Sequence, residues 1–191
     1  ARYPLTIYID YGTSTTGNDG IVRSGKIKIT LTGRYRTKGT VLTIEPEDFT
    51  RDNVKISGVK TVTNEGENEK GNITFSIKVE NAILTTQDGT IQWNSQRKRE
   101  WIEGSKTLRL YDDVYSITGQ ANGKDVNGNA FTVTIKEPLI VKLNCPNIVQ
   151  GILIFEVENF KLSRELDYGN GECDKKATLK VGNQTKEITL K

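Results

Sequence analysis

The sequence predicts an all-β protein built from antiparallel sheets, and three observations lead to this fold class. Apolar and polar residues alternate at a period of two, which is typical of strands with one buried face. No window of a dozen residues keeps the apolar spacing of an amphipathic helix. Asn-Gly and Asp-Gly pairs separate the alternating runs, and such pairs provide the positive φ angles that tight hairpin turns need.

Each alternating run is expected to form one strand. The alternation is clear from Ile27 to Leu31, and it recurs over 75–80 and 131–136. β-Branched residues dominate these runs, because their stiff side chains suit a pleated, half-buried surface. Turn signals lie between strand-like runs at 18–20, 88–89, 127–128 and 170–171. The spacing predicts about 13 to 15 short strands, arranged as sandwiches or meanders.

Internal similarity predicts two related modules. The phrase at 9–12 (IDYG) recurs at 166–169 (LDYG), and the segment 72–84 resembles the segment 129–140. The alternation lapses near Gly104 to Asp112, so we expect a first β-module over 1–104 and a second over 105–191, each sandwich-like or a meander. Chance repetition in a β-rich sequence is the alternative explanation.

A further repeated phrase ends in glycine. An apolar residue, a small polar residue and Gly follow one another at 31–33, 56–58 and 117–119, and more loosely at 149–151. Glycine weakens a strand, so its repetition there indicates β-bulges or close backbone contacts.

Composition excludes several functional classes. The 191-residue chain has 27 Lys plus Arg, 24 Asp plus Glu and no His. Without His, a Ser-His-Asp triad, a Cys-His dyad and a His-ligated metal site are impossible. The net charge of +3 is too small to predict a nucleic-acid partner. No apolar run approaches the roughly 20 residues of a membrane-spanning helix, so no transmembrane segment is expected. We also expect no cofactor and no metal.

The two cysteines, Cys145 and Cys173, are predicted to form a disulfide. The strand-like runs 148–157 and 162–168 form a hairpin, and a turn centred on Asn159 places the cysteines opposite each other. Their Cα atoms would then lie about 4.5 to 5.5 Å apart, within the reach of a disulfide. A register shift of one residue would remove this prediction. Two buried thiols in a cytosolic protein are the alternative, whereas a disulfide favours an oxidising compartment.

The segment 91–103 (IQWNSQRKREWIE) is the most unusual stretch and the predicted ligand-binding site. In one extended strand, the side chains of Trp93, Arg97, Arg99 and Trp101 lie on the same face. Exposed Trp and Arg on a sheet could bind a glycan or another extended polymer. The alternative is that the arginines cover the tryptophan rings as ordinary packing, in which case no binding surface exists.

Carboxylate pairs are the remaining catalytic option. Glu45, Glu47 and Asp48 form one cluster, and Asp112 and Asp113 form another. A glycosidase needs two carboxylates facing each other about 5 to 10 Å apart. Clusters at strand ends are more typical of solvated turns, so no catalytic residue is assigned.

Several phrases together resemble a known group of proteins. They are 99–102 (REWI), 113–119 (DVYSITG), 131–135 (FTVTI), 166–171 (LDYGNG) and 173–178 (CDKKAT). The set is similar to uncharacterised secreted surface lipoproteins of Bacteroidetes. This resemblance implies export to the outer membrane or cell surface, with a lipid anchor on a precursor segment absent from this chain. It implies no activity.

These observations predict a non-catalytic surface protein of the cell envelope. We expect a role in adhesion, glycan contact or structure, with a glycan or another envelope protein as partner. The alternative is a carboxylate-based glycan hydrolase.

Overall fold

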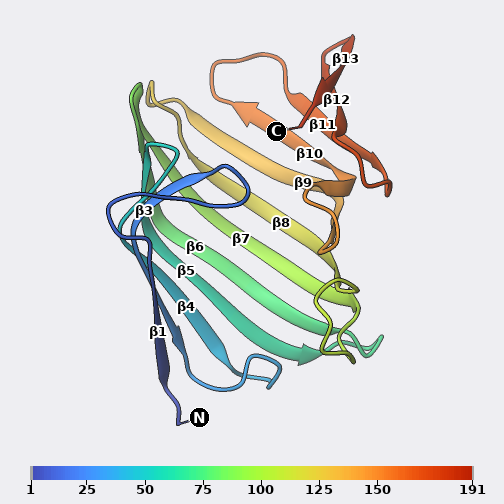
Figure 1. Ribbon diagram of the computed structural model, residues 1–191. Helices are drawn as coiled ribbons and strands as arrows, with labels where there is room; N and C mark the ends of the chain where they lie inside the picture. The colour runs from blue at the N-terminus through green and yellow to red at the C-terminus, as the bar shows by residue number, and fades with distance from the viewer. Residues whose placement is uncertain (1, 191) are drawn as a thin grey trace.

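The strands follow chain order across one antiparallel sheet of 13 strands, which the computed structural model shows for residues 2–190 (Figure 1). The short β2 pairs with the start of β3 and lies off the main path. This part of the chain contains no helix, and therefore none that could span a membrane. The all-β prediction is confirmed, and the strand number lies within the expected range. The strands are β1 (Leu5–Asp10), β2 (Thr15–Thr16), β3 (Val22–Leu31), β4 (Val41–Arg51), β5 (Val54–Glu67), β6 (Ile73–Thr86), β7 (Gly89–Glu103), β8 (Val114–Lys124), β9 (Ala130–Lys142), β10 (Ile148–Val157), β11 (Arg164–Asn170), β12 (Lys176–Val181) and β13 (Gln184–Thr189).

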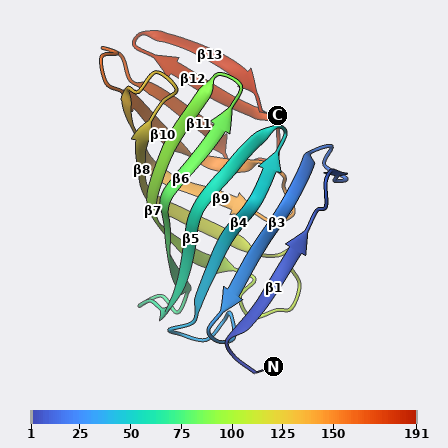
Figure 2. The ribbon, with the colours of Figure 1, turned by 90° about the vertical axis from the view of Figure 1, so that its left-hand side faces the viewer.

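Strand alternation gives the sheet one apolar and one polar face. In β6, Phe75 and Ile77 are buried on one face, while Lys78 is exposed on the other. The sheet curls around its apolar face into an open trough, with β1 to β5 forming one wall and β9 to β13 the other (Figures 1 and 2). The Phe131 ring of β9 accordingly lies 5.8 Å from that of Trp93 in β7. We call the apolar side the concave face and the polar side the convex face.

Glycines allow the bulges that interrupt the ladders. Gly58, Gly119 and Gly151 have φ angles of 110°, 118° and 112°, and each lies at a shift in strand register. A β carbon there would lie 2.3 to 2.5 Å from a backbone atom of the neighbouring strand. The prediction from the repeated glycine phrase is confirmed at these three positions. Gly33 differs, because it lies in the loop after β3. Bulges bend a strand and increase its twist, which helps the sheet to curl.

The sheet continues across the predicted module boundary. β7 and β8 pair from Gln92 opposite Lys124 to Glu103 opposite Val114, so the 104–113 segment is a loop between neighbouring strands. The two similar segments found in the sequence lie mainly on β6 and β9. The division into modules 1–104 and 105–191 stays a prediction about internal repetition, and hydrogen bonding does not break there.

The β3–β4 loop closes one end of the trough. Its Tyr35 ring stacks on buried Phe75 with centroids 5.1 Å apart. The neighbouring Arg36 lies over the Trp101 ring and donates hydrogen bonds to the backbone carbonyls of Ser105 and Thr107. The loop thus covers the concave face where β7 ends.

The predicted disulfide is confirmed, although the register that led to it is wrong by one residue. Cys145 and Cys173 are bonded, with Cα atoms 5.7 Å apart. In the β10–β11 ladder, Leu153 pairs with Leu166, where the predicted register places Glu165. Both cysteines lie in loops beyond the ladder, so their bond does not depend on its register.

Candidate functional site

The predicted ligand-binding residues share one face of β7, but one of them is not accessible. Trp93, Arg97 and Arg99 are half-buried on the concave face. Trp101 is only 2% exposed, so the expectation that it offers a ring to a ligand is wrong. Its Nε1 donates to Asp113 Oδ1 at 3.2 Å, and the Arg36 guanidinium lies 4.7 Å from its ring centroid. Trp101 is a core residue because the sheet curls around it and the β3–β4 loop covers it.

Asp113 is a buried carboxylate whose hydrogen-bond partners are side chains of the core. It is 1% exposed and accepts hydrogen bonds from Trp101 Nε1 and from the Tyr115 hydroxyl, the latter at 3.3 Å. Burial and the nearby charge of Asp113 raise the pKa of Tyr115. This carboxylate therefore joins two aromatic side chains in the core of the closed end.

Three of the four other candidate carboxylates are engaged with cations or hydroxyls, and the fourth, Glu47, is exposed. Glu45 pairs with Lys28 at 3.2 Å, and Asp48 pairs with Lys55 at 2.8 Å. Asp112 accepts a hydrogen bond from Thr107 Oγ1 at 3.0 Å. Residues 2–190 hold no group of three or more His, Cys, Asp or Glu side chains that could bind a metal ion.

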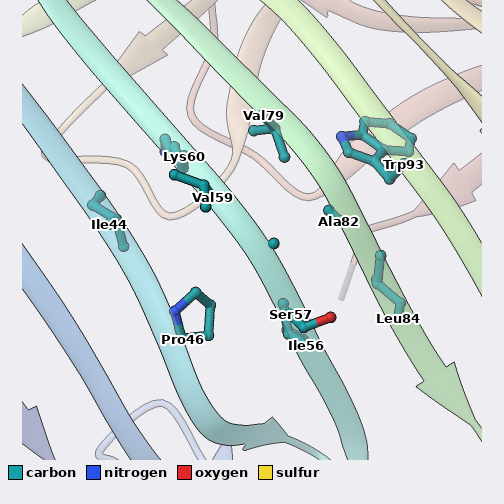
Figure 3. A pocket seen from close by; sticks show the side chains of 11 residues that line it. Ile44, Pro46, Ile56, Ser57, Val59, Lys60, Val79, Ala82, Leu84 and Trp93 are labelled. Carbon is teal, nitrogen blue, oxygen red and sulfur yellow. The ribbon is translucent and has the colours of Figure 1, made fainter.

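An apolar hollow of about 400 Å³ lies on the concave face over β4 to β7 (Figure 3). Gly58 and Ala82 lie in contact at the bottom of the hollow. The hollow exists because both residues are small, since larger side chains would fill the space. Of the four predicted site residues, Trp93 is the one that lines this hollow. The other apolar side chains around it include Ile44, Pro46, Ile56, Val79 and Leu84.

Three cations lie next to this hollow on the same face. Lys60 lines the hollow and pairs in register with Val79, which pairs with Ser95. Arg97 and Arg99 occupy the next two concave positions of β7, opposite Ile77 and Phe75. We call Lys60, Arg97 and Arg99 the cation cluster.

The cation cluster has no internal counter-ion. None of its members takes part in an ion pair within residues 2–190. The Nε atoms of Arg97 and Arg99 are buried without a hydrogen-bond partner. Burial lowers the pKa of Lys60, and the nearby charges of Arg99 and Arg97 lower it further. Burial also lowers the pKa of Arg97, while the Tyr168 phenol of β11 acts on it in the opposite sense.

Arg99 differs from Arg97 in its contacts. The Arg99 guanidinium lies 4.5 Å from the Phe75 centroid and 4.9 Å from that of Tyr115, and it donates to the Tyr35 hydroxyl. These aromatic contacts hold Arg99 in the closed end of the trough. The concave side of β7 therefore changes in character along the strand. Arg99 lies at the closed aromatic end, Arg97 and Ser95 follow, and Trp93 borders the apolar hollow.

Sequence reasoning missed Lys60 and the hollow. The sequence signal for Lys60 is its place in the strand alternation. From Ile56 to Val62, every second residue other than Lys60 is apolar or Gly, so Lys60 shares their face of the strand. The hollow has no such signal, since its lining comes from four strands. Comparisons of the chain with protein-family models, curated proteins and solved structures found no match.

Proposed function

We propose that the protein is a non-catalytic binding module of the cell envelope, whose concave face holds the apolar chain of an elongated ligand. The observation that carries this proposal is the apolar hollow beside Trp93. Its volume of about 400 Å³ lies in the range of small-molecule sites, which are typically concave and mostly apolar. This binding mode replaces the stacking of a glycan along β7, which needs an accessible Trp101.

Two observations support the non-catalytic and exported parts of the proposal. The residues that line the hollow include no carboxylate, which disfavours the alternative of glycan hydrolysis at this place. The Cys145–Cys173 disulfide favours an oxidising compartment, as expected for an envelope protein. Attachment at the outer membrane or cell surface through a lipid belongs to the same proposal and is motivated by the sequence resemblance.

The test is a titration of the protein with dodecan-1-ol, followed by tryptophan fluorescence. We expect a saturable change that disappears in Trp93→Phe, because Trp93 lines the hollow while Trp101 is buried. Leu84→Asn should weaken binding about tenfold by placing an amide in the apolar lining. Ile83→Asn is the matched control, because Ile83 is the next residue along β6 and is 42% exposed. No saturable change, or equal weakening in both variants, would contradict the proposal.

A further inference from the structure

We infer that the ligand of the concave face is a long-chain carboxylate, whose headgroup binds at Arg97 and Lys60 and whose acyl chain lies in the apolar hollow. This inference rests on the proposed function and adds the chemical class of the ligand. It follows from the charge of the trough, the order of side chains along the strands and the size of the hollow.

The unpaired positive charge of the cation cluster favours binding of an anion from outside the chain. On the convex face, some cations are paired with carboxylates, as in Lys28–Glu45 and Lys136–Glu165. The cation cluster has no such partner among residues 2–190. Arg97 and Arg99 are half-buried, and the exposed Lys60 lies close enough to both for their charges to lower its pKa. Half-buried like charges destabilise a fold unless an opposite charge compensates them. A bound anion would provide that charge.

The two arginines are suited to different tasks. Arg99 already contacts Phe75, Tyr115 and Tyr35, so it contributes to the closed end of the trough. Arg97 lies one concave position nearer the hollow and has no cation–π contact with any described aromatic ring. A guanidinium binds a carboxylate through two parallel hydrogen bonds, and Lys60 adds a point charge at the edge of the hollow.

The length of the site fits one acyl chain. From Lys60 to Ile56 the concave face of β5 extends four residues, or about 13 Å at the usual rise of a strand. An acyl chain spans about 15 Å, since two of them make up a hydrocarbon core of about 30 Å. The hollow of about 400 Å³ is a single space, which favours a ligand with one chain over a two-chain phospholipid. The headgroup would then lie at Arg97 and the chain would run past Trp93.

The experiment compares dodecanoate with dodecan-1-ol at low salt, using the fluorescence of Trp93. Both ligands have the same chain, so the alcohol measures the hollow alone. We expect dodecanoate to bind about tenfold more tightly, as charge-assisted hydrogen bonds to the headgroup require. If the alcohol binds and dodecanoate binds no better, the proposed function stands and this inference is wrong. If neither ligand binds, the proposed function fails as well.

Variants of β7 and β5 locate the headgroup. Arg97→Met and Lys60→Met should each reduce the ratio of dodecanoate affinity to dodecan-1-ol affinity. Lys98→Met is the matched control, because Lys98 is the next residue along β7 and is exposed on the convex face. Both site variants replace an unpaired cation with an apolar side chain of similar length, and urea unfolding would confirm that they fold. A preference that survives in the Arg97→Met/Lys60→Met double variant would overturn the inference.

Discussion

The substitution Gly119→Ala tests whether the bulge in β8 is required by its close approach to β7. Gly119 has a φ of 118°, which residues with a side chain rarely adopt. A β carbon at this position would lie 2.3 Å from the backbone oxygen of Gln96 and 2.8 Å from the Cα of Arg97. Both atoms belong to the backbone of β7, so relief of the clash would disturb the β7–β8 ladder.

The expected loss of stability has two parts. The strain of an unfavourable φ costs about 1 to 3 kcal/mol. Overpacking against backbone that cannot move freely costs about another 1 to 3 kcal/mol. The sum of about 2 to 6 kcal/mol is a large share of the about 5 to 15 kcal/mol by which domains are typically stable.

Gly128→Ala is the matched control because it isolates the first part. Gly128 has a φ of 82°, but a β carbon there would have no heavy atom within 4 Å. Its cost should be the strain alone, about 1 to 3 kcal/mol. Urea unfolding followed by circular dichroism gives both values. If Gly119→Ala loses no more than Gly128→Ala, the close approach of the two strands does not determine the choice of glycine at 119.

Three further predictions concern stability. Replacing Cys145 and Cys173 with Ser should reduce the free energy of unfolding by about 3.5 kcal/mol, because the disulfide closes a loop with a sequence separation of 28 and so lowers the entropy of the unfolded chain. Urea unfolding with and without reductant would measure this loss. Asp113→Ala should cost about 2 to 4 kcal/mol, because it leaves Trp101 Nε1 and the Tyr115 hydroxyl buried without an acceptor; a loss below about 1 kcal/mol would refute this role. The side-chain amides of Asn72 and Asn68 lower the pKa of Glu100, so its contribution to stability is complete above about 4.5 and is lost as the pH falls through the lowered value. The free energy of unfolding should therefore fall on acidification below pH 4.5, and Glu100→Gln should reduce that slope.

The sequence by itself determined the local features of this protein. The period of two predicts the strands and assigns each side chain to one of two faces, because alternation depends only on the geometry of a single strand. Turn dipeptides predict where the chain reverses. Three of the four repeated glycines mark bulges, because the need for a positive φ and for a missing side chain is also local.

Only the tertiary structure decided whether each face of the sheet is buried or exposed, and against which residues it packs. Alternation places Trp93, Arg97, Arg99 and Trp101 together but does not say whether their face lies open to solvent or inside a curled sheet. Curvature depends on twist and bulges accumulated over 13 strands, and it is this curl that buries Trp101, while Trp93 remains at the edge of the hollow. The convergence of Lys60 with the arginines depends in the same way on pairing between strands. Distant positions become neighbours only when the whole sheet forms, so no pattern within one strand could reveal the cation cluster.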